Sequence, residues 1–152
     1  MNGHYEMTKL LIKNGISPNH PDSSDNYPIH YAAAYGFIDI FKLLMECGAK
    51  IDQFNAWKKT PFDIACGKNH TGISNFILSR SDFDVNLKDE HGYTIIYRLL
   101  QSKDLSVIQQ ILNTISNVDL NAKDPMDNTI LHYVAESPNE LDLQTIQEFI
   151  KH

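Results

Sequence analysis

A seven-residue segment recurs four times along the chain at a nearly constant period. The copies begin at Tyr27, Thr60, Thr94 and Thr129, so successive copies lie 33, 34 and 35 residues apart. Their sequences are YPIHYAA, TPFDIAC, TIIYRLL and TILHYVA. Self-similarity at a period of this size is typical of stacked repeats, in which each unit contacts mainly its neighbours.

Each copy opens a unit with the same order of local patterns. In the first complete unit, Pro28 stands near the start of a short predicted helix, where its missing N–H leaves no bond unmade. Gly36 ends that helix, and apolar residues at helical spacing over 38–44 predict a second, longer one that Gly48 ends. The chain is therefore predicted to be an all-α solenoid of stacked helix-turn-helix units joined by hairpin-like turns.

The period also predicts the domain organisation, a single domain over residues 1–152. A partial repeat over 1–21 precedes repeats at about 22–54, 55–88, 89–123 and 124–152, the last of them truncated. Because both ends fall inside a unit, we expect a fragment of a longer protein, with a naturally short protein as the alternative. A helix pair of this size cannot bury its apolar face alone, so stacking must supply the core.

These residues resemble the ankyrin repeat, whose motifs are an Asp-x-x-Gly-x-Thr-Pro-Leu-His turn and helix, a Gly-His reversal and a Gly-Ala-Asp return. Partial matches to these motifs lie at 27–30, 60–63 and 129–132, at 3–4 and 69–70, and at 48–52. The resemblance covers nearly the whole chain. The unit at Thr94 departs most, because Tyr97 replaces the His, and we expect looser or shifted helix packing there.

The resemblance implies a structural role for the recurring Thr and His residues. In ankyrin repeats these side chains bond each other and nearby backbone, which ties the turn to the first helix. Structural roles are therefore expected for His30, Asp63, His132, Thr60, Thr94 and Thr129. Asp63 replaces the His of its copy and is expected to accept a hydrogen bond from a turn N–H.

Composition and motif searches argue against several function classes. The formal net charge of −6 disfavours a nucleic-acid surface, which needs lysines and arginines to neutralise phosphates. The two cysteines, Cys47 and Cys66, form no CxxC pair and favour a reduced, intracellular setting, either cytoplasmic or also nuclear. No apolar run approaches the roughly 20 residues of a membrane span. Metal-ligand spacing and Gly-rich phosphate loops are also missing, so we expect no metal, no cofactor and no enzyme.

Binding is the function that the resemblance favours. Ankyrin-like stacks present their turn tips and the exposed side of their short helices as one concave surface. The candidate partner-binding residues on that surface are Ser23, Ser24, Asn26, Tyr35, Trp57, Lys59, Lys68, Glu90, His91, Tyr93, Met126 and Asn128.

Trp57 is the most informative of these residues, because it falls in an otherwise polar turn. It either contacts a partner or folds back onto its own or a neighbouring hairpin, and Trp is enriched among the residues that dominate interface energy. Lys58, Lys59 and Lys68 form a basic island in an acidic protein. The island is either a solvated face or a site for a partner's acidic residues.

The function expected from these observations is protein–protein recognition of another protein or peptide segment on the concave surface. The alternative is a regulatory or substrate-recruiting ankyrin domain of a larger enzyme, such as a kinase or a palmitoyltransferase. A purely structural spacer is the third hypothesis.

Overall fold

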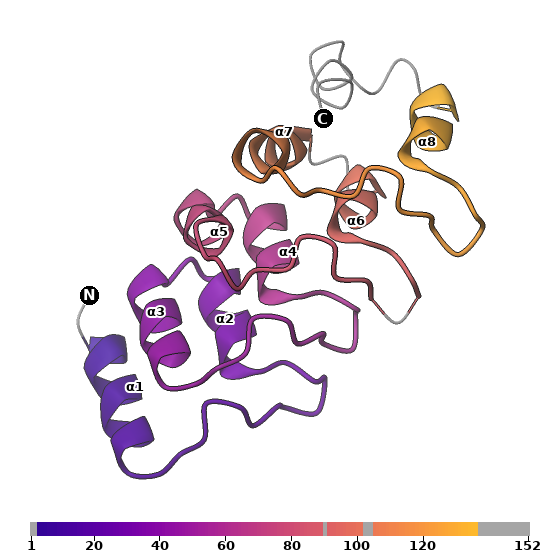
Figure 1. Cartoon of the computed structure of the whole chain (residues 1–152). Helices are drawn as coiled ribbons and strands as arrows, with labels where there is room; N and C mark the ends of the chain where they lie inside the picture. The colour runs from indigo at the N-terminus through magenta and orange to yellow at the C-terminus, as the bar shows by residue number, and fades with distance from the viewer. Residues whose placement is uncertain (1–2, 90, 102–104, 137–152) are drawn as a thin grey trace. The chain divides into compact units, whose positions relative to one another are not determined.

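The computed structural model describes residues 3–89, 91–101 and 105–136 of the chain (Figure 1). Within these ranges the chain forms eight helices and no strand, so the predicted all-α class is confirmed. The helices are α1 (Gly3–Lys13), α2 (Pro28–Ala34), α3 (Ile38–Glu46), α4 (Pro61–Gly67), α5 (Thr71–Leu78), α6 (Ile95–Gln101), α7 (Leu105–Thr114) and α8 (Ile130–Glu136).

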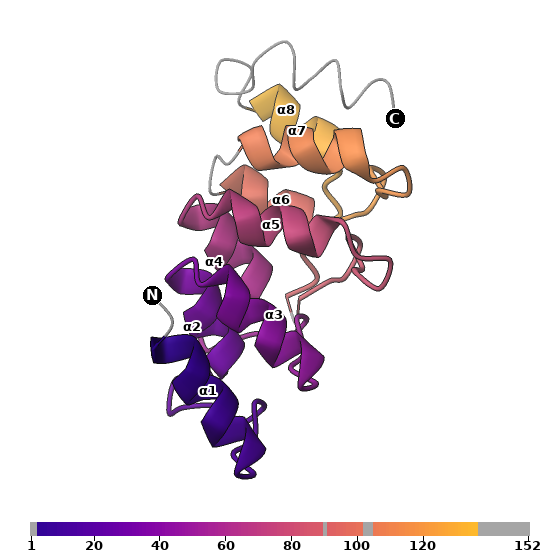
Figure 2. The same ribbon diagram turned by 90° about the vertical axis from the view of Figure 1, so that its left-hand side faces the viewer.

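The chain divides into two compact units, residues 1–77 and residues 78–152. In the first unit the short helices α2 and α4 lie side by side, and the longer α3 packs against both α2 and α1 (Figures 1 and 2). In the second unit α6 packs against α7. Within the first unit, therefore, helices of the same kind stack on one another, as the period predicts.

The short helices begin where the recurring segments predict, and the starts of α2, α4 and α8 are each fastened by the residue three positions on. The N–H of Tyr27 donates to Nδ1 of His30 at 3.1 Å. Thr60 and Asp63 exchange two such bonds, because the Thr60 N–H donates to Asp63 Oδ2 at 2.8 Å and the Asp63 N–H donates to Thr60 Oγ1 at 3.2 Å. Reciprocal bonds of this kind satisfy N–H groups that a helix start would otherwise leave unpaired.

The same fastening recurs at α8, where the Thr129 N–H donates to Nδ1 of His132 at 3.1 Å. The Thr129 hydroxyl also lies 3.0 Å from that nitrogen. Asp63 and His132 thus perform the same task with different chemistry, since a carboxylate oxygen and an imidazole nitrogen are both acceptors.

The core of each unit consists of aliphatic and aromatic side chains from the inner helix faces. In the first unit Ile29, Phe41 and Ile77 are fully buried, and in the second Ile108 and Ile111 are. Burying an aliphatic or aromatic side chain of this size contributes about 1.5–3 kcal/mol. Stability therefore depends on the stacking of successive repeats, because one helix pair by itself could not bury these side chains.

His30 also links consecutive repeats. Its Nδ1 accepts the Tyr27 N–H, so Nε2 carries the proton and faces the carbonyls of Gln53 at 3.1 Å and Lys59 at 3.2 Å. Only 1% of His30 is exposed. One side chain therefore satisfies a helix start, one carbonyl at the end of its own repeat and one carbonyl of the next repeat.

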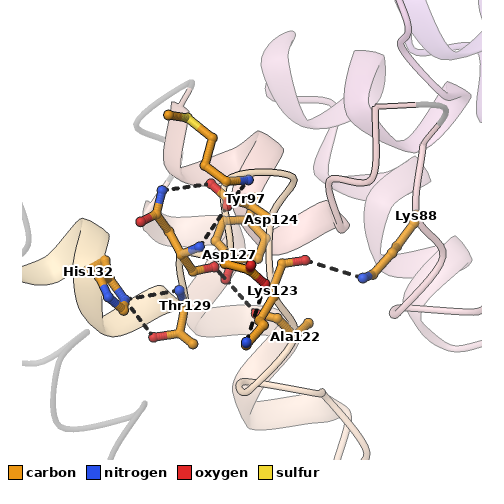
Figure 3. A network of polar contacts seen from close by, with 10 residues as sticks. Lys88, Tyr97, Ala122, Lys123, Asp124, Asp127, Thr129 and His132 are labelled. Atoms are coloured by element: carbon orange, nitrogen blue, oxygen red, sulfur yellow. Dashed lines mark hydrogen bonds and ion pairs between the residues drawn. The ribbon is translucent and has the colours of Figure 1, made fainter.

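Tyr97 makes the same link in the second unit, although its copy of the segment departs most from the others. Its hydroxyl donates to the carbonyls of Ala122 at 2.6 Å and Asn128 at 3.0 Å, which hold the positions equivalent to Gln53 and Lys59 (Figure 3). Burial, with a smaller effect of Asp124, raises the pKa of Tyr97 to about 12, so the hydroxyl keeps its proton. The repeat that begins at about residue 89, for which we expected looser packing, thus retains this connection to the next repeat.

We predict that His30→Ala lowers the free energy of unfolding by about 1–3 kcal/mol, because the buried groups that it pairs lose their partner. His132→Ala is the matched control: His132 is exposed, and within the described residues its bonds are to Thr129. Urea denaturation of both variants measures the difference. Equal losses at the two positions would contradict the inter-repeat role of His30.

The stability should also depend on pH through His30. Burial lowers the pKa of His30 below its ordinary value of 6.5. As the pH falls below 6.5, the unfolded chain takes up a proton that the folded chain resists, so His30 lowers stability progressively until the folded pKa is passed. The stability advantage of the wild type over His30→Gln should therefore shrink between about pH 7.5 and pH 5. A constant difference across that range, measured by urea denaturation, would contradict the buried neutral imidazole.

Candidate partner-binding surface

Four turn tips are organised by one side-chain oxygen each. Asp22, Asn55, Asp89 and Asp124 each lie five residues before a copy of the recurring segment. In every case Oδ1 accepts the N–H groups of the residues two and four positions later, at 2.8–3.0 Å. The amides so fastened belong to Ser24, Asn26, Trp57, Lys59, His91, Tyr93, Met126 and Asn128, all of them candidate residues.

Each tip also contains one residue with a positive φ, three positions after the organising Asp or Asn. These residues are Asp25 (φ 56°), Lys58 (φ 58°), Gly92 (φ 83°) and Asp127 (φ 62°). Glycine adopts this conformation freely and Asp tolerates it, whereas Lys is disfavoured there. The reversal at each tip is therefore set by backbone conformation together with the side-chain oxygen.

Neighbouring tips of the first unit are joined directly. The N–H of Ala56 donates to the Ser24 carbonyl at 3.0 Å, and Nδ2 of Asn55 donates to Oδ1 of Asn26 at 2.8 Å. These bonds connect two successive tips into a row that presents residues from both repeats.

The second unit has its own connection between turns. Nζ of Lys88 donates to the Lys123 carbonyl at 3.2 Å, and Nζ of Lys123 lies 3.3 Å from Oδ1 of Asp127 (Figure 3). The turns before α6 and α8 are thus linked through a lysine, where the first unit uses backbone and amide groups.

The structure places most of the predicted binding residues in reach of solvent. Ser23, Tyr35, Trp57, Lys68, His91 and Met126 are exposed, and Ser24, Asn26, Lys59, Tyr93 and Asn128 are partly exposed. Glu90 lies outside the described residues. Whether these residues contact a partner stays a prediction.

Trp57 stands two positions after Asn55 and is 64% exposed. Its N–H donates to Oδ1 of Asn55 at 3.0 Å, so its backbone is held while its ring faces solvent. Trp57 is therefore not buried against its own or a neighbouring hairpin. Lys68, from the predicted basic island, is exposed just after α4, and Lys59 is partly exposed beside Trp57.

A tyrosine supports the organising aspartate at two of the tips. The Tyr31 hydroxyl donates to Oδ2 of Asp22 at 2.6 Å, and the Tyr133 hydroxyl donates to Oδ2 of Asp124 at 2.7 Å. The Tyr31 hydroxyl, followed by the amides of Asn26 and Ser24, lowers the pKa of Asp22 to about 2.

Equivalent partners, the Tyr133 hydroxyl and the amides of Met126 and Asn128, act on Asp124, which unlike Asp22 is buried. Burial acts to raise the pKa of Asp124, but hydrogen bonds, that of Tyr133 first among them, outweigh it and lower the pKa below its usual value. Both aspartates are therefore ionised at neutral pH. Sequence reasoning missed these residues, although an Asp or Asn at a constant position before each copy was a signal that could have found them.

The described parts of the chain were also compared with the requirements of a metal site, a reactive thiol and a membrane-spanning helix. No group of three or more His, Cys, Asp or Glu side chains there could hold a metal ion. Neither cysteine forms a disulfide: Cys66 is buried, and Cys47 is partly exposed. Among the residues that the structure places, no helix is both long enough and apolar enough to span a membrane.

The comparison with protein families agrees with the stacked helices and repeated tips. The model of the family described as "Ankyrin repeats (3 copies)" matches residues 1–89, more than half of the chain. The chain therefore belongs to the ankyrin-repeat family. Members of this family are generally protein–protein interaction modules and are typically non-catalytic.

Individual relatives are similar over parts of the chain. "Poly [ADP-ribose] polymerase tankyrase" of Caenorhabditis elegans is 34% identical over 73% of this chain, and "Cyclin-dependent kinase 4 inhibitor B" of Rattus norvegicus is 33% identical over 51%. "Rabankyrin-5" of Homo sapiens is 24% identical over 90%. The matched regions make up 5%, 60% and 12% of those three proteins, so the chain spans only part of each.

We predict that Asn55→Ala lowers the free energy of unfolding by about 1–3 kcal/mol, because a nearly buried side chain loses its bonds to two amides and to Asn26. Asn55→Asp is the matched variant, since it keeps the acceptor for both amides and loses the amide donated to Asn26. Thermal unfolding should therefore rank Asp between Asn and Ala. A wild-type midpoint for Asn55→Ala would show that the tip does not depend on this side chain.

Proposed function

We propose that the chain is a protein–protein interaction module that binds a partner protein or peptide segment on a concave surface of turn tips and short helices. The observation that carries the proposal is the exposure of Trp57, a residue that is 64% exposed on a tip whose backbone is fastened by Asn55. A large aromatic side chain on a fixed backbone loses little conformational entropy on binding, and Trp is enriched among the residues that dominate interface energy.

The surroundings of Trp57 support a particular mode of contact. Lys59 on the same tip and Lys68 after α4 are both accessible to solvent in a chain of net charge −6. A partner segment with an apolar group on Trp57 and acidic groups near these lysines would gain complementary charge at the rim of the contact. The similarity to a protein named as a kinase inhibitor also supports recognition of another protein.

The proposal includes the setting in which this recognition takes place. Two cysteines outside any disulfide and the absence of a CxxC pair support a reduced compartment, the cytoplasm or also the nucleus. The net charge supports a protein partner over a nucleic acid, and the proposed recognition needs no cofactor and no catalysis by this chain.

The second candidate is a regulatory or substrate-recruiting domain of a larger enzyme. The similarity to a protein named as a poly [ADP-ribose] polymerase, of which the matched region is 5%, favours this candidate. The sequence of the messenger that encodes this chain discriminates the two. A catalytic domain in the same reading frame favours the second candidate, and an open reading frame with no such domain favours the first.

We predict that the double variant Trp57→Ala/Lys59→Ala loses capture of its partner, while its thermal midpoint stays that of the wild type. Removing an interface Trp costs about 2 kcal/mol or more, which is roughly a thirtyfold loss of affinity. The measurement is an affinity pull-down of wild type and variant from the same lysate, followed by titration with the purified partner.

The matched control is Lys9→Ala/Leu10→Ala, which removes an exposed lysine and an exposed apolar side chain from α1. This control should bind as the wild type does. Equal capture by the wild type and the Trp57→Ala/Lys59→Ala variant would overturn the assignment of the tip as a contact.

A further inference from the structure

One turn tip differs from the other three in the sign of its charge. The tips over residues 22–26, 89–93 and 124–128 each contain two acidic residues and neither Lys nor Arg. The tip over residues 55–59 contains two lysines and no acidic residue, in a chain of formal net charge −6. All four tips share the same hydrogen bonds from one Asp or Asn side chain, so the turn itself does not require this reversal of charge.

Two residues of this tip depart from what the turn favours, and both departures make the tip more positive. The organising residue is Asn55, whereas the other three tips have an aspartate at that position. The position with positive φ holds Lys58 at 58°, whereas the other tips have two aspartates and a glycine there. Lys is disfavoured in this conformation, and backbone outliers of this kind concentrate at functional sites.

The same tip carries the exposed Trp57. Its exposure does not arise at an end of the chain, because copies of the recurring segment lie both before it, at Tyr27, and after it, at Thr94. The neighbouring tip of the first unit is in place as well, since the N–H of Ala56 donates to the Ser24 carbonyl at 3.0 Å. Trp57 nevertheless remains 64% exposed.

The acidic residues around the tip restrict where a negatively charged occupant can lie. Between residues 55 and 70, Asp63 is the one acidic residue, and it is buried and bonded at the start of α4. The exposed acidic residues precede the tip: Asp52 in the return, and Asp22 and Asp25 in the adjacent tip. An acidic segment would therefore be attracted by one tip and repelled by the tip beside it.

The backbone of the tip distinguishes carboxylates from phosphates. The N–H groups of residues 56–59 are all paired already, with the side chain or carbonyl of Asn55 or with the carbonyl of Ser24. Phosphate sites typically use open backbone N–H groups or the planar fork of Arg, and this tip offers neither. Recognition of an anion is left to the lysine side chains, which suits the separate carboxylates of Asp and Glu.

We infer that the tip over residues 55–59 selects a partner segment in which acidic residues flank an apolar one, and that the adjacent acidic tip keeps this segment from shifting to the neighbouring repeat. The apolar residue lies on Trp57, and the carboxylates lie near Lys58 and Lys59. The inference rests on the proposed function, since it specifies the chemistry of the segment and adds Lys58 to the contact.

The test uses the fluorescence of Trp57, which is the only tryptophan in the sequence and therefore reports on this tip. The probes are the peptides acetyl-Asp-Asp-Leu-Asp-Asp-amide and acetyl-Asn-Asn-Leu-Asn-Asn-amide, which have nearly equal size. At low ionic strength the acidic probe should bind about fivefold more tightly than the neutral one, as expected for two exposed charge pairs. The preference should disappear in about 1 M salt, where the Debye length is about 3 Å. Equal binding at low ionic strength would overturn the inference.

Lys58→Asp/Lys59→Asn is the decisive variant, because it gives the tip the residues that two of the other tips carry at these positions. It should fold, as thermal unfolding can verify, and should lose the preference for the acidic probe. Lys58→Gly, which introduces the residue of the remaining tip, should keep about half of the preference. An unchanged preference in both variants would overturn the inference.

Two controls address charge in general and the adjacent tip in particular. Lys9→Asp/Lys13→Asn makes the same two changes at exposed positions of α1 and should leave the preference unchanged. Asp25→Asn removes an exposed negative charge from the adjacent tip and should tighten binding of the acidic probe. An equal loss of preference in the α1 control, or weaker binding by Asp25→Asn, would contradict recognition at this tip.

The remaining outcomes separate this inference from the proposed function. Displacement of the acidic probe by inorganic phosphate at equal ionic strength would assign the tip to a phosphate group and overturn the inference. Partner capture that needs Trp57, with no preference for the acidic probe, would overturn the inference alone and leave the proposed function standing. Partner capture that ignores Trp57, with no fluorescence response to either probe, would overturn both.

Discussion

A buried polar side chain ties the start of a short helix to the turn that leads into the next repeat, beside the bonds that join the turn tips themselves. In the first unit the His30 imidazole bonds its own helix start and reaches the carbonyl of Gln53, at the end of its own repeat, and the carbonyl of Lys59 in the next one. In the second unit a tyrosine hydroxyl reaches the equivalent carbonyls. Since an unpaired buried carbonyl is costly, these links define how one turn sits on the next. The tips, and the side chains that they present, inherit their positions from this spacing.

Two kinds of surface follow from this framework within the first unit. The tips carry residues such as Trp57 on a backbone held by a side-chain oxygen, and Lys59 and Lys68 give this region positive charge. The adjacent tip, although its backbone is held in the same way, carries Asp22 and Asp25 and has the opposite charge.

The success and the failure of sequence reasoning have the same physical origin. The period of the recurring segment predicted helices at the positions where α2, α4, α6 and α8 begin, because Pro, Thr and the residue three positions on act locally. The role of Tyr97 could not be predicted by matching residues, since a tyrosine and a histidine have different shapes yet can both donate to a carbonyl. The pairing of Tyr31 with Asp22 was missed because it joins a helix to a turn nine residues away.

The sequence by itself determined the all-α repeat fold and the family, because these depend on periodic, local signals that recur along the chain. Only the tertiary structure decided which side chains face solvent. Trp57 could have been buried against a hairpin, but 64% of it is exposed. The depression lined by α1, the first turn, α2 and α3 likewise forms only where these elements converge. Burial depends on surfaces brought together from distant parts of the chain, and no local pattern encodes that.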